Sequence, residues 1–409
     1  MRLLILTQYY PPEIGAPQNR LHELAVRLQK NGLHVEVLTA MPNYPSMEIH
    51  EAYRKGRIKE EIIDDIIIHR ARIFVSRSKS IFIRLLNYFS FVFTSIFRGR
   101  KLENFDYLMV ESPPLFLGYS ALFLSKKLKA KLIFNVSDLW PESAEKLGLV
   151  TNKTFLKLAY KLESRCYNSA HLITGQTQGI VTDIASRFPH KKVIWLPNGV
   201  DLDYYNPEKI NANGFRLRNG FNENQLLFFY GGVVGYAQGL DIILHAAKFF
   251  DSDQKIQFII QGAGPELERL QLLKLELGIS NVHFLPPVSK LDMPSVLKEI
   301  NVAIILLRNL ALFTGAIPSK VFETLAMEIP ILLGVDGEAR THFVDKAKAA
   351  LFVEPENTQM LIVAIQQLID NPNLGIEMGK NGRKYAMETF NRNKIAQDFL
   401  NELKALSQN

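Results

Sequence analysis

Short runs of β-branched and leucine residues recur along the chain, and stretches with helical spacing separate them. This alternation is typical of parallel sheets whose strands are connected by helices. The pattern therefore predicts two α/β units. Strands are expected near residues 3–7, 34–38, 66–74, 107–111, 131–136, 171–174 and 193–196 in the first unit, and near 226–230, 256–260, 282–285, 302–306, 331–334 and 350–353 in the second.

The periodic pattern is interrupted at residues 201–225, which are rich in Asn, Pro and Gly. Such composition indicates a connecting segment. We therefore expect a first domain at 1–200, a linker at 201–225 and a second domain at 226–389. The final segment, 390–409, has apolar residues at three- and four-residue steps and is predicted to be a helix that packs an apolar stripe on the body.

Composition limits the class of protein. The 409 residues are 47% hydrophobic and 22% charged, which is typical of a soluble globular protein of about two domains. A single cysteine, Cys166, cannot form an intramolecular disulfide and favours a reducing, cytoplasmic setting. No secretory signal pattern follows Met1. The nine histidines are dispersed, and we expect neither a bound metal nor a cofactor.

Positive charge is concentrated in one segment. Residues 66–102 contain eight Lys or Arg and no acidic residue, against a net charge of +7 for the whole chain. Within the segment, 81–97 reads as an amphipathic helix that is too short and too polar to cross a membrane. Two interpretations remain open, a helix that lies in a membrane interface and a buried helix of the first domain. The residues that would meet lipid are Arg77, Lys79, Arg84, Phe89, Phe93, Phe97, Arg98, Arg100 and Lys101.

Glycine-rich turns follow three predicted strands, at residues 7–17, 231–239 and 261–266. In open α/β sheets, ligands bind beyond the carboxyl ends of strands, where helix N-termini attract anions. None of the turns matches the dinucleotide fingerprint or the Walker A motif. We therefore expect a phosphate-bearing ligand in the cleft between the two units.

Four motifs in order, at 197–201, 238–241, 262–265 and 318–323, resemble those of retaining glycosyltransferases of family 4. Residues 10–21 and 135–143 are similar to bacterial transferases of O-antigen and capsule synthesis, including N-acetyl-L-fucosamine transferases. The resemblance implies a GT-B fold, with two Rossmann-like domains that face each other across a cleft and a last helix, 390–409, that crosses back to the first domain.

The same resemblance implies a donor site, in which Glu323 binds the ribose, Lys320 neutralises phosphate charge and the backbone of Val288 meets the base. Its members are Gly15, Ala16, Gly232, Gly264, Val288, Gly315, Ala316, Ile317, Ser319, Lys320 and Glu323. Cationic residues common in the family are replaced here by Val233 and Gln238, and a common carboxylate is replaced by Gly315. Arg20, Arg308 and Lys320 remain as candidate phosphate-binding cations.

The resemblance further implies transfer with retention from a UDP-sugar to a polyprenyl-diphosphate-linked saccharide at the cytoplasmic membrane surface. Such a lipid acceptor favours the membrane interpretation of 81–97, whereas no nucleic-acid module is visible. Donor N–H groups and a cation can stabilise a leaving phosphate without metal. Asp138 is a candidate contact to the donor sugar or acceptor hydroxyl, or else a helix N-cap. Glu111 and Glu142 are candidate acceptor contacts.

Two other functions stay open. A nucleotide-sugar epimerase on a similar scaffold would need further acid and base groups in the cleft. A non-catalytic subunit of a polysaccharide assembly complex would account for the missing cations at Val233 and Gln238.

Overall fold

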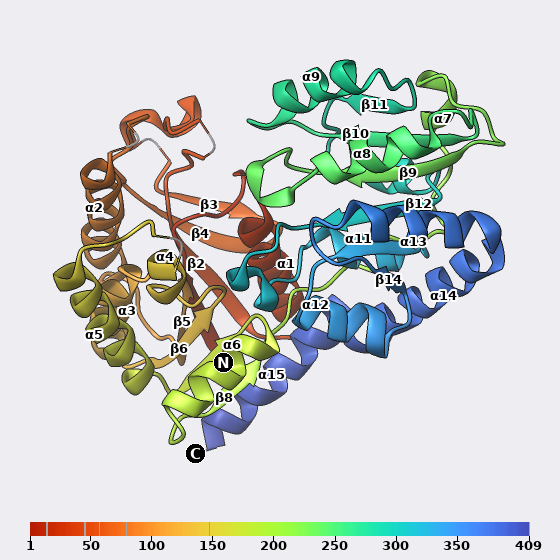
Figure 1. The fold of residues 1–409 in the computed structure, drawn as a ribbon. Coiled ribbons are helices and arrows are strands. Elements are labelled where there is room, and N and C mark those ends of the chain that lie inside the picture. The colour runs from red at the N-terminus through yellow and green to blue at the C-terminus, as the bar shows by residue number, and fades with distance from the viewer. Residues whose placement is uncertain (14, 45, 57, 79, 147, 409) are drawn as a thin grey trace. The chain divides into compact units, whose positions relative to one another are not determined.

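The computed structural model describes residues 1–13, 15–44, 46–56, 58–78, 80–146 and 148–408. Its contacts divide the chain into two compact units (Figure 1). The first comprises Met1–Asn198 with Arg392–Asn409, and the second comprises Gly199–Asn391. Both are α/β units with parallel sheets, as the sequence predicts.

The first unit contains an eight-stranded sheet in the order β3-β4-β2-β1-β5-β6-β7-β8. Its strands are β1 (Arg2–Leu6), β2 (His34–Ala40), β3 (Glu60–Ile63), β4 (Ile66–Ala71), β5 (Tyr107–Ser112), β6 (Lys131–Val136), β7 (Leu172–Gly175) and β8 (Val193–Trp195). All pairs are parallel except β3–β4. That hairpin turns at Asp64 and Asp65, whose φ angles are both positive, as a two-residue type I′ turn requires.

Helices cover both faces of this sheet. They are α1 (Ala16–Lys30), α2 (Ile81–Gly99), α3 (Leu117–Leu128), α4 (Glu142–Lys146), α5 (Lys153–Ser169), α6 (Gln178–Arg187) and α15 (Arg392–Gln408), with a 3₁₀ turn η1 (Glu51–Gly56). One buried cluster joins α1 and α15 to the sheet, and another joins α2, α3 and α5 to its opposite face. The Tyr107 hydroxyl donates to the Leu403 carbonyl at 2.6 Å. The predicted return of the last helix to the first domain is thus confirmed.

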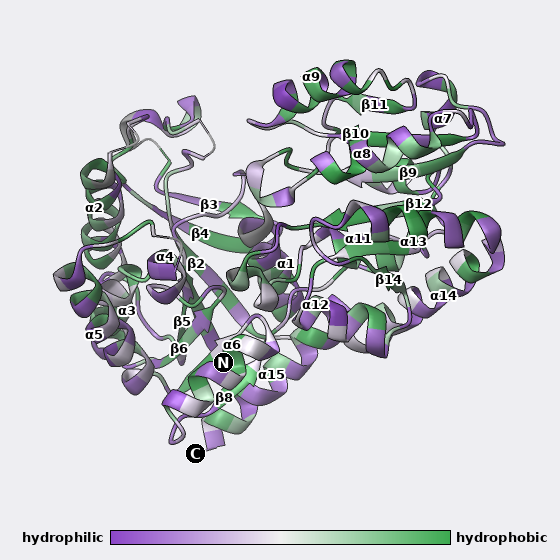
Figure 2. Cartoon of the chain, in the orientation of Figure 1, coloured by the Kyte–Doolittle hydropathy of each residue, from purple (hydrophilic) through white to green (hydrophobic). Residues whose placement is uncertain are grey.

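The second unit contains a six-stranded parallel sheet in the order β11-β10-β9-β12-β13-β14. Its strands are β9 (Leu226–Gly231), β10 (Ile256–Gln261), β11 (Val282–Leu285), β12 (Val302–Leu306), β13 (Ile331–Gly334) and β14 (Ala350–Phe352). This is the doubly wound order in which the first and fourth strands are neighbours. Figure 2 shows its strands as an apolar layer.

The helical elements of the second unit are α7 (Phe215–Arg218), η2 (Tyr236–Gln238), α8 (Asp241–Phe250), α9 (Leu267–Leu277), α10 (Met293–Leu297), η3 (Ala311–Gly315), α11 (Lys320–Ala326), α12 (Glu338–Arg340), η4 (Thr341–Lys346), α13 (Thr358–Asp370) and α14 (Pro372–Thr389). The predicted linker, 201–225, belongs to this unit and is packed on it. Phe215 and Phe221 are buried, and the Glu299 carboxylate accepts the backbone N–H groups of Asn213, Phe215 and Arg216. Asn- and Gly-rich composition did not reveal this packing.

Candidate functional site

A pocket of about 470 Å³ opens at the point where the strand order of the second sheet reverses. The carboxyl ends of β9 and β12 meet there, and ligands of open α/β sheets bind at such points. The lining residues are Tyr230, Gly231, Gly232, Val233, Gln238, Met293, Leu307, Phe313, Ala316, Ile317, Pro318, Ser319, Lys320 and Glu323. Most of the predicted donor residues of the second domain are therefore brought together.

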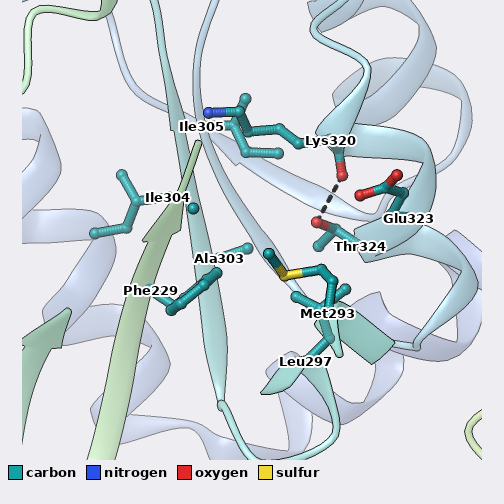
Figure 3. A pocket seen from close by; sticks show the side chains of 10 residues that line it. Phe229, Met293, Leu297, Ala303, Ile304, Ile305, Lys320, Glu323 and Thr324 are labelled. Atoms are coloured by element: carbon teal, nitrogen blue, oxygen red, sulfur yellow. Dashed lines mark hydrogen bonds between the residues drawn. The ribbon is translucent and has the colours of Figure 1, made fainter. Parts of the chain in front are cut away.

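Lys320 begins α11, and its side chain extends from the helix toward the strand ends (Figure 3). Its ammonium lies 3.8 Å from the centre of the Tyr230 ring and directly beside Gly232, where an added Cβ would approach Nζ to 3.0 Å. Burial lowers the pKa of Lys320 to about 7, although the Glu323 carboxylate acts in the opposite direction. Within the described residues, the ammonium has no hydrogen-bonding or ion-pair partner. A cation held this way is poised for an anionic ligand.

Glu323 follows Lys320 by one turn of α11, so both side chains face the same pocket. Tyr204 lies close to it. Burial raises the pKa of the Tyr204 hydroxyl, and the carboxylates of Asp292 and Glu323 raise it further. Tyr204 comes from the predicted linker, so sequence reasoning missed it, as it missed Tyr230.

A smaller cavity of about 40 Å³ adjoins the pocket and shares Lys320, Glu323, Gly231 and Met293 with it (Figure 3). Its other walls are apolar side chains of β9, β12 and α10, together with Thr324 of α11. The stems of Lys320 and Glu323 are thus set in an apolar environment that strengthens electrostatic interactions with a ligand.

The turn before α11 presents backbone donors. In the part of the chain that the structure describes, the N–H groups of Ile317, Ser319 and Lys320 make no hydrogen bond to the protein. Gly315 and Ala316 belong to the same turn, and Ala316 lines the pocket. These N–H groups can donate hydrogen bonds to phosphate oxygens.

Gly264, a predicted donor position, lies in a tightly packed turn. A Cβ on Gly264 would lie 2.2 Å from the Val234 carbonyl oxygen, and one on Gly262 would lie 1.8 Å from the Gly232 oxygen. The turns after β9 and β10 therefore pack backbone against backbone, which explains Gly264 without a ligand. Val288 is half-buried in the loop after β11 and does not line the pocket.

Arg308 does not serve as a second free cation. Its guanidinium donates to Glu356 at 2.6 Å and to the Tyr236 carbonyl at 2.7 Å, and it lies 3.5 Å from Asp241. Because Val233 and Gln238 are uncharged, Lys320 is the only cationic side chain among the residues that line the pocket.

In the first unit, the turn before α1 is organised by Glu13. Its buried carboxylate accepts the backbone N–H groups of Tyr10, Asn43 and Tyr44, and burial raises its pKa against these bonds. Gly15 has an extended backbone, and a Cβ there would collide with the Gln18 amide oxygen at 2.3 Å. Ala16 begins α1.

Glu111, a predicted acceptor contact, is instead the centre of a buried polar network. Its two carboxylate oxygens each receive a hydrogen bond from Arg20 at 2.8 Å, and Ser137 and Asn135 also donate to them. Only 4% of Glu111 is exposed. The predicted acceptor contact is therefore a residue whose carboxylate oxygens are already hydrogen-bonded by the protein.

We expect Glu111→Gln to lower the free energy of unfolding by about 3–5 kcal/mol, because it leaves the buried Arg20 guanidinium without its counter-charge. Urea titration measures this loss. The double variant Glu111→Gln with Arg20→Met should recover part of it. If Glu111→Gln is as stable as the wild type and has a raised KM for the acceptor, Glu111 contacts the acceptor as the sequence predicts.

Asp138 and Glu142 lie on the segment that leads into α4. The Asp138 side chain is exposed and accepts the Ser143 hydroxyl at 2.8 Å, so it does not cap α4 by accepting a backbone N–H in the described structure. Glu142 pairs with Lys146 at 2.5 Å. Both carboxylates remain accessible to a ligand.

Comparison with protein families decides the class. Residues 18–204 match the family model described as Glycosyltransferase Family 4, and residues 214–385 match the one described as Glycosyl transferases group 1. This chain carries both domains of a glycosyltransferase.

Curated relatives cover the whole glycosyltransferase chain. This chain is 25% identical over 416 residues to the proposed colanic acid biosynthesis glycosyl transferase WcaI of Escherichia coli K12. The match covers 99% of this chain and 100% of that protein. This chain is 20% identical to O-antigen chain mannosyltransferase C of Escherichia coli, covering 98% and 97%.

Solved structures match the glycosyltransferase along its length. Sucrose-phosphate synthase from Thermosynechococcus elongatus has a TM-score of 0.72 at 15% identity, with complete coverage of both chains. Anabaena Alr3699/HepE in complex with UDP and glucose has a TM-score of 0.71 at 16% identity, covering 99% of this chain and 100% of that chain. The predicted GT-B fold is confirmed.

Helix α2 of this glycosyltransferase has two unlike faces. Asn87, Phe91 and Ser95 are buried against the first unit, whereas the opposite face exposes Phe82 (68%), Phe93 (59%) and Phe97 (56%) together with Leu86. Helical spacing places these four apolar residues on one stripe. The buried-helix interpretation of 81–97 therefore describes one face only, and the exposed face leaves membrane binding as a prediction.

Phe89 is a correction to the predicted lipid contacts. Its ring is half-buried and lies 5.0 Å from that of Phe116. Arg77 pairs with Glu48 and Arg98 pairs with Glu60, while Arg84, Arg100 and Lys101 are exposed. Lys79 lies outside the described residues.

Among the described helices, none has the length and apolar character needed to cross a membrane. The described residues also contain no group of three or more His, Cys, Asp or Glu arranged to hold a metal.

Proposed function

We propose that this glycosyltransferase moves a sugar from a nucleoside-diphosphate donor, held in the second unit, to a saccharide acceptor of bacterial surface polysaccharide synthesis. The observation that carries the proposal is the Lys320 ammonium, which has no ion-pair partner among the described residues and is seated on Tyr230 beside Gly232 at the strand-order switch point. Named relatives in colanic acid and O-antigen synthesis support the polysaccharide role.

For the donor, we propose UDP carrying an N-acetylated deoxyamino hexose such as N-acetyl-L-fucosamine. Glu323 would accept the ribose hydroxyls, and Lys320 with the N–H groups before α11 would bind the diphosphate. The base would lie toward the loop that contains Val288.

For the reaction, we propose retention without a metal. As the bond from the sugar to the diphosphate breaks, negative charge grows on the leaving phosphate, and fixed donors stabilise it. Asp138 and Glu142 are two accessible carboxylates of the first unit that could receive or orient an acceptor hydroxyl.

The experiment is calorimetric titration with UDP and GDP, followed by incubation with UDP-sugars, a chelator and a bacterial lipid extract. We expect UDP binding and a mass increase of one sugar in a lipid-linked product. Binding without any product on acceptor would favour the non-catalytic subunit. An altered sugar nucleotide without acceptor would favour the epimerase. Binding of neither nucleotide would refute the donor site.

We also propose that the α2 stripe rests in an anionic membrane surface, where its acceptor lipid would be anchored. The apolar residues Phe82, Leu86, Phe93 and Phe97 match the acyl boundary, and the exposed Arg100 and Lys101 match anionic headgroups. On the neighbouring α3, Tyr119 and Phe123 are likewise exposed, at 43% and 47%.

The triple variant Phe82→Ser, Phe93→Ser and Phe97→Ser should bind phosphatidylglycerol vesicles at least about 10-fold more weakly, because each exposed ring contributes apolar area to lipid binding. Vesicle co-sedimentation measures the change. Phe249→Ser, at an equally exposed site of α8, serves as the control. Equal vesicle binding by a folded triple variant would contradict the membrane proposal.

A further inference from the structure

Tyr230, the last residue but one of β9, lines the donor pocket and contacts two other parts of it. Its side chain is buried and belongs to the core cluster of the second unit, so packing fixes the position of the ring. The Lys320 ammonium lies over the ring, 3.8 Å from its centre. This is well within the distance at which an aromatic face attracts a cation.

The Tyr230 hydroxyl holds the turn that follows β9. It donates to the Val233 carbonyl at 2.5 Å, and burial raises the pKa of the hydroxyl, so it keeps its proton. In the same turn, the backbone N–H of Gly232 donates to the Gln261 carbonyl at 2.9 Å. Gly232 is thereby held beside the ammonium, where an added Cβ would lie 3.0 Å from Nζ of Lys320.

The charge of Lys320 is sensitive to its surroundings. Burial lowers the pKa of Lys320 to about 7, so the ammonium and the neutral amine have similar free energies near neutral pH. The other titratable groups among the described residues of the pocket lining are Tyr230 of β9 and Glu323 of α11. Glu323 favours the ammonium through its charge. An aromatic face adds to this, and can change the ratio of ammonium to amine by about 3- to 30-fold.

We propose that Tyr230 is a positioning residue for glycosyl transfer, because its ring keeps the Lys320 ammonium charged and in place to bind the diphosphate of the sugar donor. This inference rests on the proposed donor site and adds the residue that allows one lysine to serve there. Val233 and Gln238 are uncharged, and Lys320 is the only cationic side chain among the described residues of the lining. A neutral amine at Lys320 would therefore leave the diphosphate without a cationic side chain from this lining.

Tyr230→Leu removes the ring and tests the proposal through the pH dependence of UDP binding. The variant should bind UDP about 3- to 30-fold more weakly than the wild type at pH 8, where loss of the ring leaves more of the neutral amine. At pH 5.5 the difference should be at most about 2-fold, because the amine is largely protonated in both proteins. Calorimetric titration measures both ratios. An equal loss at the two pH values overturns the proposal, since a merely distorted pocket binds UDP less well at either pH.

Two replacements that keep the shape of the ring separate its charge distribution from its packing. Tyr230→Phe loses only the hydrogen bond to the Val233 carbonyl, so its UDP affinity should change by the same factor at pH 8 and pH 5.5. A fluorinated phenylalanine at position 230 weakens the negative face of the ring and should reproduce most of the pH-dependent loss of Tyr230→Leu. If it behaves as Tyr230→Phe does, the ring acts by packing alone and the proposal is wrong.

Tyr236→Leu is the matched control. The exposed Tyr236 ring lies 4.2 Å from the guanidinium carbon of Arg308, so the same substitution removes an aromatic face from a cation. Arginine does not lose its proton in this pH range. We therefore expect the ratio of UDP affinities at pH 8 and pH 5.5 to stay at the wild-type value. A pH-dependent loss equal to that of Tyr230→Leu would show that the effect is not specific to Lys320, and would overturn the proposal.

A titration without any ligand separates this proposal from the proposed function. In protein that carries carbon-13-labelled lysine, the NMR signal of Lys320 is identified by its absence from Lys320→Met, and its shift reports the ammonium fraction at each pH. The midpoint should lie about 0.5–1.5 pH units lower in Tyr230→Leu than in the wild type. An unchanged midpoint overturns the proposal whether or not UDP binds. Failure to bind UDP or GDP, with the midpoint shifted as expected, refutes the proposed donor site instead.

Discussion

Lys320→Met should slow glycosyl transfer by about 10²–10³-fold and at the same time stabilise the fold. The loss follows from the chemistry of the step, since removing one fixed donor to a developing oxyanion typically costs this much. The gain follows from burial. The wild-type ammonium is set on Tyr230 without a counter-charge in direct contact, and methionine fills a similar volume without that cost.

The stability gain has a defined pH dependence. Burial lowers the pKa of Lys320 from 10.5 to about 7, so between these values the unfolded chain binds more protons than the folded one. The stability of the wild type therefore rises with pH across that interval relative to the variant. We expect Lys320→Met to be more stable by roughly 1–3 kcal/mol at pH 6, and the difference to vanish above pH 10.5.

The Lys320 ammonium should also make UDP binding depend on pH, but in the opposite direction to its effect on stability. A diphosphate favours the charged ammonium, so UDP binding at pH 8 should take up a proton, and wild-type affinity should fall as pH rises above 7. Calorimetry in two buffers of different ionisation enthalpy measures the uptake. Lys248→Met, an exposed lysine on α8, is the control. If the wild type takes up no proton on binding UDP, or if Lys320→Met has normal turnover, Lys320 does not bind the phosphate.

The strands and their alternation with helices could be predicted because buried parallel strands are apolar runs that stand out from the sequence. The missing strand, β3, could not. It is a four-residue edge strand that begins with two glutamates, and its signal lies in the turn at Asp64 and Asp65. The orientation of α2 was equally hidden, because the buried face of this amphipathic helix includes the polar residues Asn87 and Ser95, whereas three phenylalanines are exposed.

The candidate site was predictable where side chains face the ligand pocket and less so elsewhere. Lys320 and Glu323 follow from a short motif on one helix. Gly264 packs closely against the Val234 backbone, which the sequence did not indicate, and Glu111, a predicted acceptor contact, is bound by Arg20. Sequence spacing brings such residues to the edge of a sheet and does not show whether the protein itself already satisfies them.

Glu323→Ala should weaken UDP binding by about 10- to 100-fold, because an ionised carboxylate that accepts two ribose hydroxyls contributes about 1.5–3 kcal/mol. The carboxylate faces the pocket one turn after Lys320, and its charge also acts on Tyr204. Calorimetry measures the loss. Glu276→Ala, an exposed glutamate on α9, has the same change of charge and should bind UDP normally.

A ligand that lacks the ribose hydroxyls distinguishes a direct contact from a distorted pocket. The wild type should bind 2′,3′-dideoxy-UDP as weakly as Glu323→Ala binds UDP, and the variant should not discriminate between the two ligands, since the interaction energy of a pair disappears when either partner is absent. If Glu323→Ala still prefers UDP by the wild-type ratio, the ribose is bound elsewhere. The carboxylate would then act on the site only through its effect on Lys320 and Tyr204.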